Sequence, residues 1–237
     1  MAKHKVLSTK KLEPSLIEQA KQNQIEIIEQ EAVKIISILS KEKCEEVFRQ
    51  MERKKQFAVF TSSNAVIALK NYLDETVSPF QFNWQIFSLS GKTKEVLDDN
   101  SQLFGAVIGS ADHSKGLAEK IVSAKVEEVI FFCGNKRREE LPNFLKSAGI
   151  KVHEVVVYQT VETPVISNDD VEAVLFFSPS AVQSFFSINQ LKKNVVCFAI
   201  GQTTANSISA FTNNKIVVVG SPSQKSMLAS LNFFFKT

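Results

Sequence analysis

The sequence contains the same short series of motifs twice, in the same order, and this internal repeat limits the folds that the chain can adopt. The first motif of each series reads as an apolar strand that breaks into a hydroxyl-rich turn and a helix. The pairs are FTSSNAV at 60–66 with FFSPSAV at 176–182, SGKT at 90–93 with IGQT at 200–203, and SADHSKGLA at 110–118 with SPSQKSMLA at 221–229. A weaker fourth pair has equal spacing, from Leu16 to Ile25 and from Leu141 to Ile150. The repeat predicts two similar α/β domains with the functional site between them.

Composition and charge narrow the class of protein. The chain has 237 residues, of which 44% are apolar and 22% charged, as in ordinary soluble proteins. A net charge of +3 is too small to indicate nucleic acid binding, and no apolar run approaches the length of a membrane span. The first residues, MAKHK, lead directly into a strand without an apolar signal region, so we expect a cytoplasmic protein. Cys44, Cys133 and Cys197 are widely spaced, which predicts reduced thiols in the core.

Strands and helices are expected to alternate along the chain. Most of the strand segments are continuous apolar runs, which are typical of parallel strands covered on both faces. The expected strands are 5–8, 25–29, 57–61, 85–89, 106–108, 128–132, 152–157, 173–177, 195–200 and 216–219. The expected helices include 41–55, 65–73, 116–124 and 139–148. This order predicts parallel sheets joined by right-handed crossovers.

Two overlong extended stretches, at 25–37 and 152–161, indicate where the domains meet. If these stretches pair and cross between the domains, the first βαβ unit joins the C-terminal third of the chain. We therefore expect one discontinuous domain of residues 1–34 and 163–237 and a second of residues 38–155, with linker strands at 35–37 and 156–162. Each domain would hold five strands, as a flavodoxin-like sheet does.

The residues that follow the expected strands are mostly small and hydroxylated. Ligands of open α/β sheets bind beyond the carboxyl ends of the strands, and helix starts there favour carboxylates and phosphates. A capping serine can simply begin a helix, as we expect of Ser62 and of Ser178 with Pro179 after it, but many such ends on two domains favour a polyanion cleft. The candidate binding residues are Lys10, Thr61, Ser62, Ser63, Ser110, Lys136, Ser178, Gly201, Thr203 and Thr204.

Motifs for other chemistry are missing from the sequence. GxGxxG, GxxxxGK[ST], HExxH and GxSxG do not occur. His4, His113 and His153 lie in different modules and form no metal-binding spacing, so we expect no metal site. We interpret His153 as structural and His113 as a solvated loop residue.

Five motifs together resemble the uroporphyrinogen-III synthase family. They are FTSSNAV at 60–66, GNKRREELPNFLKSAG at 134–149, VVVYQT at 155–160, FSPSAV at 177–182 and IGQTTA at 200–205. The resemblance covers nearly the whole chain in the right order. It implies two flavodoxin-like α/β domains joined by a two-stranded linker.

The resemblance also implies a cofactor-free reaction in tetrapyrrole (haem) biosynthesis. The substrate would be hydroxymethylbilane, a linear tetrapyrrole with acetate and propionate arms, which loses water and closes with its ring D inverted. Tyr158 matches the tyrosine of the family motif VVVYQT, and a phenol keeps its proton at neutral pH, so Tyr158 is the expected catalytic acid. Thr9-Lys10 stands where members of the family often carry Thr-Arg, and lysine lacks the bidentate fork of arginine. We expect a monomer without nucleic acid or membrane partners.

Two other classes of protein remain open at this point. One is a non-catalytic two-domain binding protein or sensor that closes around a small polyanion. The other is a flavodoxin-type nucleotide or flavin protein, which the missing phosphate loop disfavours. Isomer analysis of the product formed from hydroxymethylbilane distinguishes the synthase from both.

Overall fold

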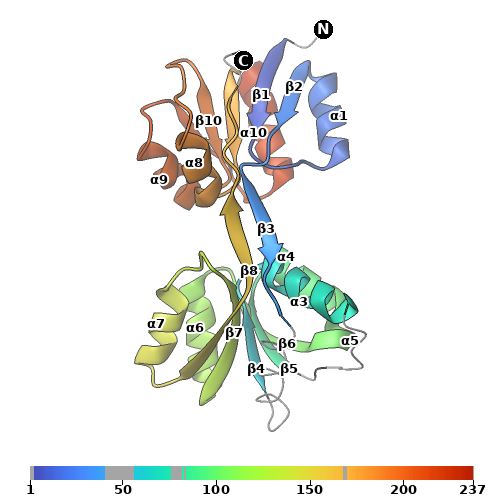
Figure 1. Cartoon of the computed structure of the whole chain (residues 1–237), viewed down its shortest axis with the longest axis vertical. Coiled ribbons are helices and arrows are strands. Elements are labelled where there is room, and N and C mark those ends of the chain that lie inside the picture. Colours follow the sequence, from blue (N-terminus) through green and yellow to red (C-terminus); the bar gives the residue numbers. More distant parts are fainter. Residues whose placement is uncertain (1–2, 41–55, 76–81, 83, 168–169, 237) are drawn as a thin grey trace. The chain divides into compact units, whose positions relative to one another are not determined.

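A computed structural model describes residues 3–40, 56–75, 82, 84–167 and 170–236 of the chain (Figure 1). The predicted helix at 41–55 and Cys44 lie outside the described residues. The chain divides into two compact units, one formed by Met1–Lys34 with Val161–Thr237 and the other by Ile35–Thr160. Each unit is built around a sheet of its own.

The first unit is a parallel sheet with helices on both faces. Its strand order is β11-β10-β9-β1-β2. The strands are β1 (His4–Ser8), β2 (Ile25–Glu29), β9 (Ala173–Phe176), β10 (Val196–Ala199) and β11 (Ile216–Val218). The helices are α1 (Pro14–Gln22), α8 (Pro179–Phe186), α9 (Gln202–Ser209) and α10 (Gln224–Lys236). One apolar cluster joins α1 and α10 to the sheet and another joins α8 and α9 to it, because alternate residues such as Val6 and Leu7 point to opposite faces.

The second unit contains a larger sheet, in which β8, β7, β4, β5 and β6 pair in parallel. Its strand order is β3-β8-β7-β4-β5-β6. The strands are β3 (Val33–Ser37), β4 (Phe57–Phe60), β5 (Trp84–Leu89), β6 (Gly105–Ala111), β7 (Glu128–Gly134) and β8 (Lys151–Glu162). The helices are α3 (Ser63–Glu75), α4 (Lys92–Asp99), α5 (Ser101–Phe104), α6 (Ser114–Ser123) and α7 (Glu140–Ser147). Helices α3, α4 and α5 contribute to one apolar cluster, and α6 and α7 contribute to the other.

The two sheets have the same order once the strands are matched. Five neighbouring strands of the second unit, β6-β5-β4-β7-β8, correspond in order to β11-β10-β9-β1-β2 of the first. The repeated motifs at 60–66 and 176–182 each begin at the last residue of a strand, and these strands, β4 and β9, are equivalent. The weaker pair at 16–25 and 141–150 corresponds to α1 with β2 and to α7 with β8. The repeat is therefore a structural duplication in which β1-α1-β2, at the start of the chain, takes the place that β7-α7-β8 has in the other unit.

Several predicted strand bounds need correction. The stretch at 25–37 is two strands, β2 and β3, with a break at residues 30–32. Because β3 joins the second sheet, that sheet has six strands, and the prediction of five in each is wrong. Strand β6 runs to Ala111, so Ser110 lies within the strand and not in the turn after it. Strand β7 likewise continues to Gly134.

Strand β3 forms one edge of the second sheet and runs antiparallel to its neighbour β8. Ile38 N donates to Val157 O at 3.1 Å, and Thr163 N donates to Ala32 O at 2.9 Å. The paired residue numbers rise on one strand as they fall on the other, which defines an antiparallel ladder. The chain passes from one unit to the other within these two strands.

Candidate functional site

The second unit has its topological switch point between β4 and β7. After β4 the chain continues to β5 and β6 on one side, and β7 then pairs with the other side of β4. In such sheets, ligands bind outside the carboxyl ends of the strands at the point where the order reverses. Here Thr61 and Ser62 directly follow β4, and Gly134 is the last residue of β7.

A cavity of about 290 Å³ opens at this switch point, and every residue that lines it belongs to the second unit. Apolar side chains from β5, β7 and α7 form part of its wall, and hydroxyl and guanidinium groups form the rest. The lining residues are Thr61, Ser62, Leu89, Ser114, Phe131, Gly134, Arg137, Arg138, Leu141 and Tyr158. The structure therefore brings three of the predicted site residues, Thr61, Ser62 and Tyr158, into one cavity.

Ser62 makes two hydrogen bonds through its hydroxyl oxygen. It accepts from Asn64 N at 3.2 Å, which confirms the predicted N-cap of α3. It also accepts from the Tyr158 hydroxyl at 3.2 Å. The start of a helix and the phenol thus meet at one serine.

An irregularity in β8 places Tyr158 over the end of β7. The register between β7 and β8 shifts between Cys133 and Gly134, so that Gly134 pairs with Tyr158. A β-bulge of this kind changes the direction of a side chain. A Cβ on Gly134 would overlap the Tyr158 ring, so the ring occupies the space that the glycine leaves.

The loop that follows β7 is attached to β8 on both sides of Tyr158. Asn135 N donates to Tyr158 O at 3.1 Å, and Thr160 N donates to Asn135 Oδ1 at 2.8 Å. Arg137 donates to the Glu154 carboxylate, and its Nη1 also donates to Glu139 Oε1 at 2.9 Å. These bonds fix the loop relative to the strand that carries the phenol.

The Glu154 carboxylate is the centre of this ion-pair network. Burial of the side chain opposes its ionisation, but hydrogen bonds from Lys146 and Arg137 outweigh burial and lower the pKa of Glu154. The pKa of Arg137 is raised, since the bond to Glu154 outweighs the effect of its own burial. Nearby, burial raises the pKa of the Cys133 thiol to about 11, which leaves it neutral and a poor nucleophile.

The predicted binding residues of the first unit lie at the carboxyl edge of its sheet. Its switch point lies between β1 and β9, where Thr9 Oγ1 donates to Leu175 O at 2.8 Å and the exposed Lys10 follows. Ser178 accepts from Ala181 N at 3.1 Å, which confirms the predicted N-cap of α8. Gly201 begins α9, and Thr203 is exposed on its first turn. Thr204 is buried, with 3% of its surface exposed, so its side chain faces the core.

Three further predicted residues do not line the cavity. Ser63 is the first residue of α3, and Ser110 lies near the end of β6. Lys136 is exposed on the loop before α7. Ser110, which was expected in a loop, is instead part of the strand ladder, paired with Ser88.

Arg137, Arg138 and Ser114 line the cavity but were not among the predicted site residues. In the sequence, the run Lys136-Arg137-Arg138 resembles a solvated charged face. The position of this run directly after a strand end predicts an anion-binding residue, but it led to the choice of Lys136 and not of the two arginines. The β-bulge that brings Tyr158 to this loop has no signature in the sequence.

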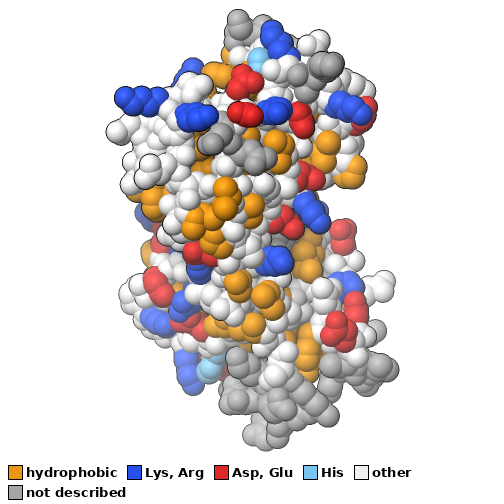
Figure 2. Space-filling model, turned by 45° about the horizontal axis from the view of Figure 1, so that its top comes forward, with side chains coloured by type: hydrophobic (Ala, Val, Ile, Leu, Met, Phe, Trp, Pro, Cys, Tyr) orange, Lys and Arg blue, Asp and Glu red, His pale blue; other side chains and the backbone are white. Residues whose placement is uncertain are grey.

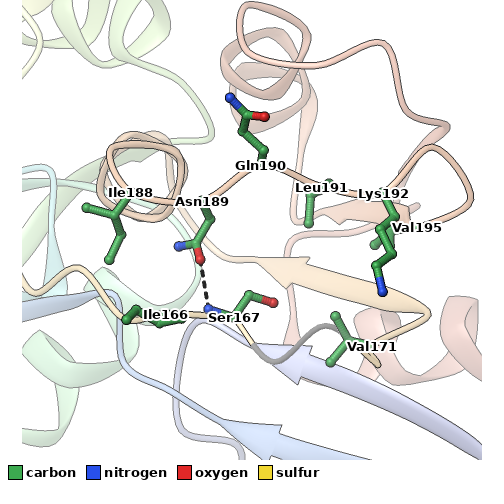
Figure 3. A pocket seen from close by; sticks show the side chains of 9 residues that line it. All are labelled: Ile166, Ser167, Val171, Ile188, Asn189, Gln190, Leu191, Lys192 and Val195. Carbon is green, nitrogen blue, oxygen red and sulfur yellow. Dashed lines mark hydrogen bonds between the residues drawn. The ribbon is translucent and has the colours of Figure 1, made fainter.

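A second cavity, of about 250 Å³, lies in the first unit at the opposite edge of the sheet (Figure 3). Val171 and Val195, which line it, precede strands β9 and β10. Asn189 joins the segments around this cavity, because its Oδ1 accepts from Ser167 N at 2.7 Å and its Nδ2 donates to Val165 O at 2.8 Å and Phe185 O at 2.7 Å. The amide therefore has a structural role.

The three histidines have different hydrogen-bond partners. His4 pairs with Glu172 and His153 with Glu128, each at 3.0 Å. His113 is exposed, as expected, but it also caps α6, where its Nδ1 accepts from Gly116 N at 3.0 Å. Within the described residues, no group of three His, Cys, Asp or Glu side chains is arranged to hold a metal ion.

Charged side chains of both signs are interspersed on the face in view in Figure 2, as the small net charge suggests. Among the described helices, none combines the length and the apolar composition that crossing a bilayer requires. Cys133 and Cys197 are buried free thiols, as predicted.

Each unit contains the strand order of a flavodoxin-like fold, which reads 2-1-3-4-5 when β1 or β7 is counted first. The family model described as uroporphyrinogen-III synthase HemD matches residues 14–229. The chain therefore belongs to the uroporphyrinogen-III synthase family, whose members are cyclising lyases of tetrapyrrole biosynthesis. The alternative of a non-catalytic anion sensor is not favoured.

Two solved structures have a similar fold. A mutant uroporphyrinogen III synthase from the extremely thermophilic bacterium Thermus thermophilus is 14% identical, with 98% of each chain covered and a TM-score of 0.69. The uroporphyrinogen-III synthetase from Helicobacter pylori is 17% identical, with 98% of this chain and 99% of that chain covered and a TM-score of 0.69. At this identity the likeness concerns the fold.

Proposed function

We propose that this chain converts hydroxymethylbilane into uroporphyrinogen III, with loss of water and inversion of ring D. The observation that supports this proposal is the Tyr158–Ser62 hydrogen bond at the switch-point cavity of a chain of this family. The hydroxymethyl group of the substrate must lose its oxygen as water before the ring can close. A phenol at a ligand-binding edge is suited to protonate that leaving oxygen.

Tyr158 supplies the proton in this proposal. The phenol donates to Ser62 at 3.2 Å, a long and therefore weak bond for two hydroxyl groups. Substrate takes the place of Ser62 as the acceptor, so that the phenol protonates the departing hydroxyl while electron density from the pyrrole nitrogen expels it. Ring closure releases one proton from the pyrrole carbon that forms the last bond, and the phenolate takes up that proton, so the phenol is restored and no net proton is consumed.

Carboxylate arms of the substrate are held at the carboxyl edges of the sheets. In the second unit the start of α3 at Ser62 and Ser63 presents backbone N–H groups, as the starts of α8 at Ser178 and of α9 at Gly201 do in the first. Such helix starts favour anions through their unpaired N–H groups and the helix dipole. Thr61, Lys10 and Thr203 add exposed or partly exposed polar groups at these edges. The buried Thr204 contributes through its position in the helix start and not through its hydroxyl.

Several finer points belong to the same proposal. The enzyme acts as a cytoplasmic monomer, and hydroxymethylbilane is its substrate. The reaction needs neither a metal nor an organic cofactor, since proton transfer and positioning suffice for loss of water and ring closure. Residues 1–34 and 163–237 form one domain and residues 38–155 the other. Light scattering at several protein concentrations measures the molar mass and so tests whether the protein is a monomer.

The decisive experiment gives the pure protein freshly made hydroxymethylbilane and separates the type I and type III isomers after oxidation. Without enzyme the bilane closes uninverted to the type I isomer. We expect type III to dominate with the protein and type I to dominate without it, also when a chelator is present. A product mixture identical to that of the buffer control would refute the proposed function.

A further inference from the structure

We infer that Arg138 is a substrate-binding residue that takes a carboxylate arm of one pyrrole ring inside the switch-point cavity. The inference rests on the proposed function for the identity of the substrate. It goes beyond the proposed function because it names the cationic side chain that binds one carboxylate arm and the cavity that holds the pyrrole ring of that arm.

The two arginines that line the cavity differ in whether they already have acidic partners. Arg137 already donates to Glu154 and pairs with Glu139. Arg138 has no hydrogen bond or ion pair with any residue in the described part of the chain. None of the described residues that line the cavity is acidic. Arg138 therefore leaves a positive charge at a cavity that supplies no counter-charge of its own.

The loop presents Arg138 from a fixed support. Asn135 is bonded to both Tyr158 and Thr160, and Arg137 is bonded to Glu154, so β8 holds the loop at points before and after the phenol. A guanidinium on a braced loop loses less conformational freedom on binding than one on an untethered loop. Its planar fork matches a carboxylate in bidentate geometry.

The size and lining of the cavity fit one substituted pyrrole ring. Its volume of about 290 Å³ is close to the lower limit of small-molecule pockets, roughly 300–1,000 Å³. Leu89, Phe131 and Leu141 give a ring an apolar wall. A ring against that wall has Arg138 available for an acetate or propionate arm and Tyr158 for the leaving hydroxyl.

The test compares Arg138→Gln with Lys151→Gln. Both changes remove one positive charge from an exposed side chain of the second unit, but Lys151 begins β8 at the opposite edge of the sheet. We expect Arg138→Gln to raise KM by about 10- to 100-fold, the range for a lost charge-assisted hydrogen bond, with a smaller change in kcat. Lys151→Gln should leave both constants near the wild-type values. Arg138→Lys should recover part of the loss, since the charge stays and the fork does not.

A binding measurement keeps this inference separable from the proposed function. Oxidised uroporphyrin III, a fluorescent octacarboxylate, is titrated with each variant, and its Kd is measured at several salt concentrations. We expect weaker binding to Arg138→Gln than to Lys151→Gln, with a difference that shrinks as ionic strength rises. Equal KM and Kd for the two Gln variants would overturn the role of Arg138, even with an active wild type. If the wild type makes no type III isomer but the Kd difference is found, the proposed function fails and the carboxylate site stands.

Discussion

At the scale of single residues, Gly134 and Tyr158 depend on each other. The phenol ring lies where a side chain at position 134 would have to be, and the bulge between β7 and β8 creates this arrangement. The glycine is therefore required by close approach and not by backbone conformation. The ring that packs against Gly134 carries the hydroxyl that donates to Ser62.

We expect Gly134→Ala to displace the Tyr158 ring and to reduce kcat by at least the amount that loss of the phenol does. Overpacking of this kind typically costs about 1–3 kcal/mol of stability, so the variant should fold with a lowered Tm. Gly220→Ala is the matched control, because a Cβ at that position meets no atom within 4 Å. Steady-state kinetics and thermal unfolding of both variants check this expectation, and an alanine at 134 without kinetic effect would contradict it.

Removal of the phenol hydroxyl tests the acid role directly. Loss of a general acid typically costs about 10²–10⁴-fold, and we expect Tyr158→Phe to lie at the low end, since the pyrrole nitrogen supplies much of the driving force. Stability should change little, as the Ser62 bond is long and worth about 1 kcal/mol or less. A folded variant with the wild-type rate and type III yield would leave Tyr158 with a structural role.

At the scale of secondary-structure elements, the network around Glu154 connects α7, the loop after β7 and strand β8. Lys146 on α7 and Arg137 on the loop both donate to this one carboxylate, which is 19% exposed. The two bonds hold the ionised form in the folded state, so the folded pKa of Glu154 lies below its usual value of 4.5. The stabilisation is present above the unfolded pKa and is lost as the pH falls through the folded pKa.

We therefore expect the stability difference between the wild type and Glu154→Gln to be constant at neutral pH and to shrink as the pH falls below about 4.5. Urea unfolding of both proteins at a series of pH values measures this difference. Glu127→Gln, at an exposed position directly before β7, controls for the general effect of one carboxylate. A difference that grows toward acid pH would contradict the assignment.

Sequence reasoning predicted these elements better than it predicted their ends. The βα order followed from apolar runs, and the caps at Ser62 and Ser178 followed from hydroxyls directly before helices. The length of β6 did not, because Gly109 and Ser110 resemble a turn although they pair with β5. The bulge at Gly134 and the ion pair between Arg137 and Glu154 both depend on contacts between residues about 20 positions apart in the sequence, which a local pattern does not reveal, so the charged run resembles a solvated face.

At the scale of the whole molecule, the chain order of the first unit differs from its order in space. Strand β1 lies between β2 and β9, with Leu7 in the same apolar cluster as Val174 and Phe176. The duplicated sheet order explains how a βαβ unit at the start of the chain completes a sheet whose other strands come at its end. The overlong stretches in the sequence indicated this, whereas the break at residues 30–32 did not follow from apolar pattern alone.

Rejoining the two parts of the discontinuous domain tests that organisation. His4 stacks on Phe235 with ring centroids 4.1 Å apart, so the first strand and the last helix end close together and a short Gly/Ser linker can join residue 237 to residue 1. We expect a chain of residues 163–237, linker and residues 1–34 to unfold cooperatively in urea. Residues 163–237 alone should not, because β9 would lose its pairing with β1 and expose its apolar faces. Cooperative unfolding of 163–237 alone, with the same midpoint as the rejoined chain, would show that residues 1–34 are not part of this domain.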